Sequence, residues 1–250
     1  MIGPSLTGMK TAVDEIAEGI YRICTYVADA SPGGFTYNQF LLDGEDPLLF
    51  HCGPRRMFPE IFEAAERVLS VERLRWISFG HLESDECGSM NQWLHAAPDA
   101  TLVVGETTAD VSIADLANRT PQPWPDGEVI DIGGKRLRYI ATPHVPHGWD
   151  AGLLWEEVTG TLLAGDLFTH VGAGPPVRDD DIVERAFAAD DLYKGMTALT
   201  PSTAPTIRKL AALAPTTLAL MHGSSFDGDC QEALVALADG YEARLLDAMG

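Results

Sequence analysis

The sequence predicts an α/β fold in which two mixed β-sheets pack face to face and carry helices on their outer faces, an αββα sandwich. Three observations lead to this prediction. Strand-like alternation or short apolar runs recur along the chain. They alternate with helical patterns in the order strands, helix, strand, helix, and a similar order follows in the second half. The proline-rich connector at 120–127 is too short to separate independent domains, so we expect a single domain over residues 1–250.

The first half begins with strands. The stretches EGIYRICTYV (18–27) and TYNQFLLDG (36–44) alternate and flank an SPGG turn, which predicts an antiparallel pair. DPLLFHCG (46–53) predicts a third strand that ends in a glycine loop. The helix expected at 59–70 starts at Pro59, a favourable first-turn residue. The remaining elements of this half are strands at 74–80 and 101–106 and a helix at 108–118.

The second half repeats the scheme with hairpins. EVIDIGGKRLRYIATP (128–143) contains a Gly-Gly turn, and GLLWEEVTGTLLAGD (152–166) predicts a second hairpin. TTLALMHG (216–223) predicts a strand that ends at a histidine. The helices of this half are expected at 180–199, 202–214 and 230–249.

The charge and the cysteines restrict the class of function. With 17 basic and 37 acidic residues, the formal net charge is −20. Nucleic acid and anionic membranes are therefore unlikely partners, because binding to phosphate depends on clusters of Lys and Arg. The four cysteines show no metal-finger spacing, no run reaches transmembrane length, and the start MIGPSLTGMK has no apolar leader core. We expect a reduced, cytoplasmic protein.

One segment, FGHLESDECG (79–88), carries a histidine and three acids within six positions. Such side chains repel one another unless a positive charge lies between them. Taken alone, the segment is as typical of a solvated loop as of a metal site. Three further donors, however, each lie at or just past a predicted strand end, where sites are commonly assembled. The candidate metal ligands are His81, Glu83, Asp85, Glu86, His147, Asp166 and His222.

This donor set is large enough for a dinuclear centre, with Asp166 as the natural bridging carboxylate. His144 lies in the same turn as His147 and is an alternative ligand. His170, four residues past Asp166, is expected to support a ligand or line the pocket, and an ordinary surface histidine is the alternative.

The chain contains, in this order, an HxExD motif, a histidine after a TP-rich turn, a GD pair and an HG pair. This order of motifs resembles that of the metallo-β-lactamase fold superfamily. Hydrolases of that superfamily usually show HxHxDH, whereas a Glu at the third position resembles the flavodiiron and oxygen-binding diiron (ODP-like) branch. HGWD (147–150) resembles the HWPD element of that branch, and MHGSSF (221–226) resembles its SHG element. The resemblance extends from EIAEGIYRI (15–23) to the closing helix, and it implies a metallo-β-lactamase-like fold.

The resemblance also implies how the ligands are shared. One metal would be held by His81, Glu83, His147 and Asp166, and the other by Asp85, Asp166 and His222. Two positions depart from the family pattern. Glu86 stands where the family usually has a histidine, and a glutamate there could bind metal, form a hydrogen bond or point away. His51 stands where the fold commonly has an aspartate that supports the site.

Carboxylate-rich sites favour iron or manganese over zinc, so we expect two iron ions, with manganese or zinc as alternatives. The resemblance implies a protein that binds or reduces dioxygen or nitric oxide. Because the chain ends soon after His222, we expect no flavodoxin-like domain and hence an external electron donor. The alternatives are a dinuclear metal-dependent hydrolase of an ester, thioester, lactone or phosphodiester, and a degenerate relative without activity. A homodimer is a further expectation, since many relatives of this fold dimerise.

Overall fold

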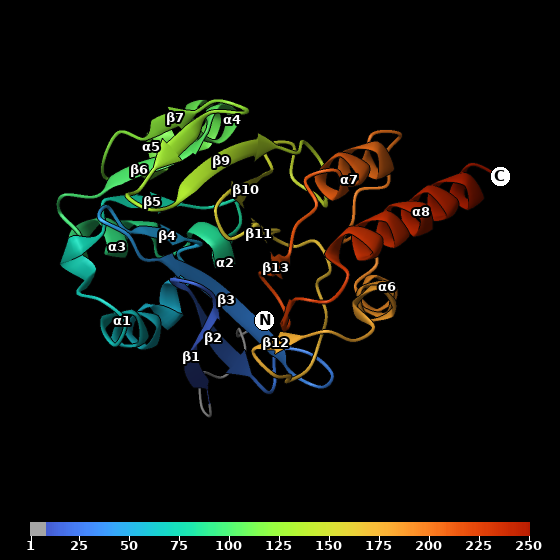
Figure 1. Cartoon of the computed structure of the whole chain (residues 1–250), viewed down its shortest axis with the longest axis horizontal. Helices are drawn as coiled ribbons and strands as arrows, with labels where there is room; N and C mark the ends of the chain where they lie inside the picture. The colour runs from blue at the N-terminus through green and yellow to red at the C-terminus, as the bar shows by residue number, and fades with distance from the viewer. Residues whose placement is uncertain (1–8) are drawn as a thin grey trace.

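The computed structural model describes residues 9–250, so the stretch MIGPSLTG lies outside it. Two seven-stranded sheets form the centre of the molecule (Figure 1). In the first sheet the strands lie in chain order, antiparallel from β1 to β4 and parallel from β4 to β7. Its strands are β1 Lys10–Ala17, β2 Ile20–Val27, β3 Phe35–Leu42, β4 Leu48–Phe50, β5 Trp76–Ser78, β6 Thr101–Gly105 and β7 Gln122–Trp124.

The second sheet has the order β12-β14-β13-β11-β10-β9-β8, with β11 and β13 parallel. Its strands are β8 Val129–Asp131, β9 Arg136–Ala141, β10 Gly152–Glu156, β11 Thr161–Leu163, β12 Val177–Arg178, β13 Thr217–Ala219 and β14 Ser225–Phe226.

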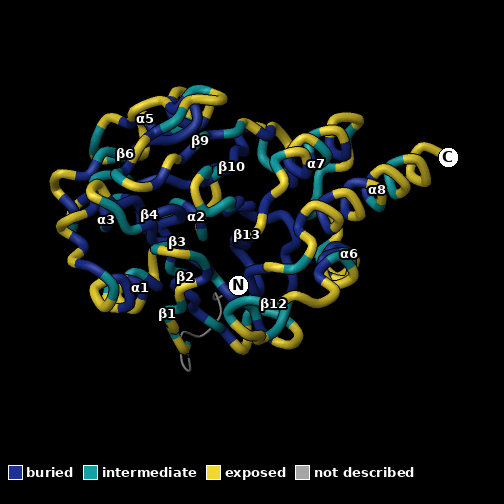
Figure 2. Tube along the Cα trace, in the orientation of Figure 1, coloured by how far each residue is buried: buried dark blue, intermediate teal, exposed yellow. Residues whose placement is uncertain are grey.

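Helices cover the outer face of each sheet (Figure 1), and three clusters of buried apolar residues lie in the layers that result. Figure 2 shows the buried segments of the chain in dark blue. Helices α1 (Phe58–Glu66) and α3 (Met90–Ala96) pack on the first sheet. Helices α6 (Ile182–Leu192), α7 (Thr203–Ala211) and α8 (Cys230–Met249) pack on the second. A third apolar cluster, which includes Phe40 and Leu154, lies between the sheets. The predicted αββα arrangement is therefore confirmed.

Several elements differ from the prediction. Strand β1 was not expected, because its residues are mostly half-buried or exposed and its apolar pattern is weak. Helix α3 and the short helix α2 (Ser84–Cys87) were also missed. The helix expected at 180–199 ends at Leu192, and the one expected at 108–118 is a π-helical turn, Ala109–Ile113, flanked by α4 (Glu106–Thr108) and α5 (Ala114–Leu116). Strand β7 lies inside the proline-rich connector.

The strand order determines where the donor residues meet. Parallel strands end at a common edge of their sheet, and loops at that edge are where ligands usually bind. The loops that follow β5, β9, β11 and β13 contain the candidate ligands. Among the helices of residues 9–250, none has both the length and the hydrophobicity that a membrane span requires.

Candidate metal centre

Each half of the molecule contributes donors to one cluster. From the first half, His81 follows β5, Glu83 precedes the first turn of α2, and Asp85 lies within that turn. From the second half, His147 lies in the loop after β9, while the remaining two donors follow β11 and β13. These are Asp166 and His222.

Four of these side chains form a compact group. The Oε2 atom of Glu83 lies 3.1 Å from Nε2 of His81 and 3.1 Å from Nε2 of His147. The Oδ2 atom of Asp166 lies 3.3 Å from Nε2 of His147 and 3.7 Å from Nε2 of His81. The four donor atoms all lie within 4.8 Å of one another, which is the spacing of ligands around one ion.

Asp166 connects this group to a second one. While its Oδ2 faces His81 and His147, its Oδ1 lies 3.3 Å from Nε2 of His222. The same Nε2 lies 3.2 Å from Oδ2 of Asp85. The two oxygens of one carboxylate therefore face two different sets of donors, as expected of a residue that bridges two ions.

Oxygen atoms lie on the far side of two of the histidine rings. Nδ1 of His222 lies 2.7 Å from the carbonyl oxygen of Thr36, which can only accept a hydrogen bond, so the proton is on Nδ1. Nδ1 of His81 lies 3.2 Å from Oε1 of Glu86. In both rings Nε2 is then free to present a lone pair to the shared space, an arrangement that metal-binding histidines usually have.

Glu86 is not brought into the ligand group. Its side chain is fully buried, and its Oε2 accepts hydrogen bonds from the backbone N–H of Gly80 (2.7 Å) and of His81 (2.8 Å). Its Oε1 faces His81 on one side and Nε2 of His51, 3.6 Å away, on the other. Glu86 thus holds the loop and the ring of His81 from behind.

The carboxylates of the cluster favour a positive charge between them. Burial disfavours a charged ring, yet the negative charge of Glu86 and the interactions of the ring N–H groups with the carboxylates of Glu83 and Glu86 raise the pKa of His81 to about 12. Burial also opposes the charge on His222, but Asp166 and Asp85 raise its pKa well above the usual value. Hydrogen bonds from His147 and His81 lower the pKa of Glu83. Without a metal, protons on the imidazoles supply the charge that a metal would otherwise bring.

Strand β3 holds the loop that carries His222. The side-chain amide of Asn38 donates to the carbonyl oxygens of Leu220 (2.7 Å) and Gly223 (2.8 Å), and the N–H of Gly223 donates to Oγ1 of Thr36 (2.6 Å). These contacts join the first sheet to a ligand loop of the second. Thr36 was not singled out in the sequence, because a threonine in a strand carries no signal of such a role.

His170 and His144 both lie outside the ligand group. Burial lowers the pKa of His170 to about 4, so the ring is neutral. Its Nδ1 donates to the carbonyl of Phe168, and its Nε2 accepts from the N–H of Ser224. His170 thus supports the loop after His222, whereas His144 is exposed.

Asp150, the last residue of the HGWD element, was not singled out in the sequence. Its side chain accepts a hydrogen bond from the N–H of Leu82.

A cavity of about 280 Å³ opens onto the two donor groups. Three aromatic residues form a wall beside the Asp85 and His222 side: Phe35, Tyr37 and Tyr193. This volume suits a small molecule, since drug-sized ligands occupy pockets of about 300–1,000 Å³.

The residues present fit a pair of metal ions. Oδ1 of Asp166 is buried and accepts no hydrogen bond of proper geometry from residues 9–250, although Nε2 of His222 is close. Both atoms therefore face a common point instead of each other. Such a buried, unsatisfied oxygen is costly unless a cation binds it.

Comparisons with known proteins show which proteins this chain resembles. The diflavin flavoprotein A 1 of Nostoc sp. is 29% identical over 168 residues, which are 64% of this chain and 27% of that protein. The coenzyme F420H2 oxidase of Methanothermobacter marburgensis is 26% identical over 193 residues, 70% of this chain and 46% of the oxidase. The chain thus spans less than half the length of these relatives.

A solved structure and a family model extend the agreement to the fold. The flavo di-iron protein of Thermotoga maritima superposes with a TM-score of 0.81 at 19% identity, covering 93% of this chain and 63% of that one. The model described as "ODP family beta lactamase" matches residues 35–219, which include six of the candidate ligands and the strands before them. The chain belongs to this ODP family.

Proposed function

We propose that the chain is a non-haem diiron protein that binds or reduces dioxygen or nitric oxide and takes its electrons from an external donor. Its similarity to an F420H2 oxidase and to flavodiiron proteins supports this proposal. The observation that carries it is the division of the Asp166 carboxylate between two donor groups, one of which contains Glu83 in place of a third imidazole. Oxygen-rich donor sets favour iron over zinc.

In this proposal each ion has its own ligands. Glu83, His81 and His147 would hold one ion, Asp85 and His222 the other, and Asp166 both. A bound iron pair would supply electrons and open coordination positions for a diatomic molecule.

The chain's own residues would orient and enclose the reaction. The carbonyl oxygen of Thr36 would orient the ring of His222 through a hydrogen bond, and the buried carboxylate of Glu86 would orient the ring of His81 through its charge. The aromatic wall of Phe35 and Tyr37 excludes bulk water from one side of the cavity. Small substrates are admitted to the space above the ligands, while the net negative charge disfavours nucleic acid.

The proposal extends to the cellular setting. We propose a cytoplasmic protein, because all four cysteines are free. The electron donor would be a separate redox protein or domain, and the molecule could act as a homodimer. The third apolar cluster joins residues of both halves, which supports one domain over the whole chain.

Anaerobic purification followed by elemental analysis and oxygen titration tests the function. We expect iron as the dominant metal, and oxygen consumption when an artificial one-electron donor is supplied. Asp166→Asn should abolish both, whereas Asp115→Asn, which changes an exposed acid of α5, should leave both intact. Zinc or manganese together with turnover of a simple ester or phosphodiester would instead establish the hydrolase.

A further inference from the structure

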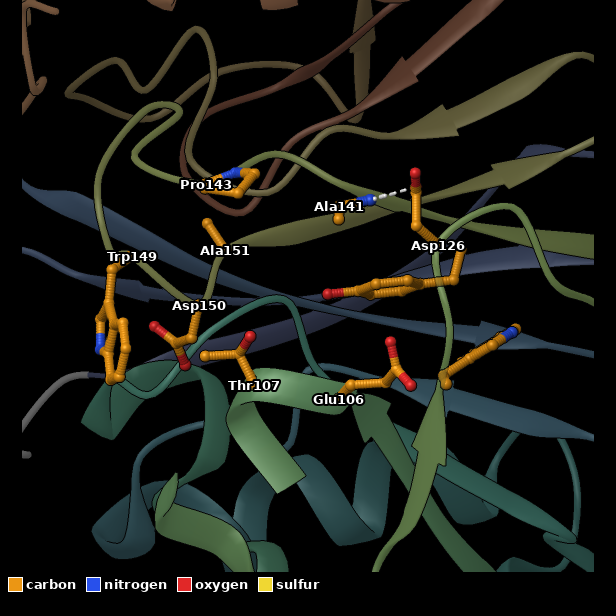
Figure 3. A pocket seen from close by; sticks show the side chains of 10 residues that line it. Glu106, Thr107, Asp126, Ala141, Pro143, Trp149, Asp150 and Ala151 are labelled. Atoms are coloured by element: carbon orange, nitrogen blue, oxygen red, sulfur yellow. Dashed lines mark hydrogen bonds between the residues drawn. The ribbon is translucent and has the colours of Figure 1, made fainter. Parts of the chain in front are cut away.

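A second acidic pocket has a lining that includes none of the ligand group (Figure 3). Its volume is about 70 Å³. Three carboxylates line it, those of Glu106, Asp126 and Asp150, and they come from three different segments of the chain. Within residues 9–250 none of the three forms an ion pair with a basic side chain. The pocket therefore concentrates negative charge that the protein itself does not neutralise.

Two of these carboxylates are held in place. Oδ1 of Asp126 accepts a hydrogen bond from the N–H of Ala141 (2.9 Å). Oδ2 of Asp150 accepts from the N–H of Leu82 (3.0 Å) and from Oγ1 of Thr108 (3.1 Å). In each carboxylate the second oxygen has no hydrogen-bond donor in the part of the chain that is described, so it is available to a ligand.

The hydroxyl group of Tyr139 is the independent sign of a ligand. Tyr139 is only 3% exposed, it lines the pocket, and its hydroxyl has no hydrogen-bond partner among residues 9–250. A Cβ atom at Gly105 or Gly152 would lie 2.1 or 2.0 Å from this oxygen, so glycine is required at both positions. Burial, Asp150 and Asp126 raise the pKa of Tyr139, which keeps the phenol neutral.

Aromatic rings complete the lining. The rings of Trp124 and Tyr139 are stacked, with centroids 5.9 Å apart and an interplanar angle of 27°. Trp149 lies at the mouth and is 57% exposed, although large apolar side chains are usually buried. Aromatic faces attract organic cations, and Trp does so most strongly.

We propose that this pocket binds the ammonium group of a small amine or of a lysine side chain. The three carboxylates supply the charge, and the free oxygen of Tyr139 can accept an N–H. A bare metal ion fits less well, because the only set of three or more donor atoms within 4.8 Å of one another in residues 9–250 is the group around Asp166. The volume admits a head group with a short alkyl chain and excludes a nucleotide.

Titration calorimetry of the full chain with methylammonium chloride tests the proposal, with sodium chloride at equal ionic strength as the blank. We expect saturable binding that Glu106→Gln and Asp126→Asn each weaken about threefold, since exposed ion pairs contribute modestly. Tyr139→Phe should weaken it about fivefold through loss of one hydrogen bond. Glu128→Gln is the matched control: its exposed acid lies near Asp126 but outside the pocket, and binding should stay within about twofold of the parent.

A lysine analogue separates the two sources of the ammonium group. Binding of both methylammonium and Nα-acetyl-lysine methylamide supports a protein side chain as the ligand, and binding of methylammonium alone supports a free amine. Absence of saturable binding overturns the proposal, as does an equal loss in Glu128→Gln and Asp126→Asn. Displacement of methylammonium by a lower concentration of Mg²⁺ also overturns it, because the pocket would then be a metal site.

Discussion

Glu86→Gln changes one buried carboxylate oxygen into an amide nitrogen while the side chain keeps its size. In the parent protein Oε2 of Glu86 accepts two backbone N–H groups, at 2.7 and 2.8 Å, and Oε1 faces Nδ1 of His81 at 3.2 Å. The amide oxygen of the variant must take the place of Oε2, because an NH₂ group there would face two donors. The NH₂ group then lies against Nδ1 of His81.

When a metal takes the place of the second proton, the neutral ring of His81 in the parent protein keeps its one proton on Nδ1, facing Glu86, and in the variant that proton has to move. A ring that faces an NH₂ group must accept at Nδ1, so its proton shifts to Nε2, the atom 3.1 Å from Oε2 of Glu83. Nε2 then has no lone pair for a metal. Loss of such a supporting partner typically weakens metal binding about 10- to 100-fold, or about 1.4–2.8 kcal/mol.

Metal affinity is measured by titrating the apoprotein with Fe²⁺ or Co²⁺ in competition with a chelator under anaerobic conditions. Glu18→Gln, an exposed acid on the turn between β1 and β2, is the control for the loss of one charge. Circular dichroism and urea unfolding show that the variant is folded. If folded Glu86→Gln binds metal within about twofold of the parent, the buried carboxylate does not set the tautomer of His81 and the reasoning is refuted.

Three further predictions concern the same region. Asp166→Asn should remove both ions, whereas Asp85→Asn should remove only the one on the His222 side, as elemental analysis can check. Burial opposes ionisation of Glu86, but His51 and His81 lower its pKa from 4.5 to about 2. The ionised carboxylate therefore stabilises the folded apoprotein above pH 4.5, and this stabilisation is lost as the pH falls towards 2. Urea unfolding at a series of pH values should show this loss, and Glu86→Gln should lack it. Gly223→Ala should destabilise the fold by more than Gly127→Ala, for which strain of about 1–2 kcal/mol is expected. Both glycines have positive φ, but only a Cβ atom at 223 would lie 2.2 Å from the His170 ring. Urea unfolding compares the two variants, and equal losses of stability would contradict this account.

The strand ends and the donor order could be predicted because both are properties of local sequence. Strands β5, β11 and β13 are short apolar runs, and each is followed within a few residues by a donor. The donors after β11 and β13 could be expected to converge because these parallel strands share an edge, whereas their meeting with the donor after β5 depends on how the two sheets pack. Helix α3 and strand β1 were missed, since their residues lack a strong period and are stabilised by packing against distant parts of the chain.

The position of Glu86 could not be predicted, because its direction depends on contacts with distant residues. Two departures from the family pattern, His51 and Glu86, proved to be neighbours, with Nε2 and Oε1 3.6 Å apart. At position 51, where the fold commonly has an acid, this chain has a histidine. At position 86, where the family usually has a histidine, it has an acid. Sequence reasoning treated them separately, although the structure brings this acid and this imidazole together in the interior.

The ligand group has a consequence for how much of the protein a cell retains. Its donors come from both sheets, so an ion bound there links segments that are far apart in the chain, and its binding energy is added to the folding energy. A chain made while the metal is scarce would lack this link, and the three carboxylates and three imidazoles of the ligand group would remain close together. Such a chain should open more often and be degraded sooner, so its abundance should rise and fall with the supply of the metal even at a constant rate of synthesis.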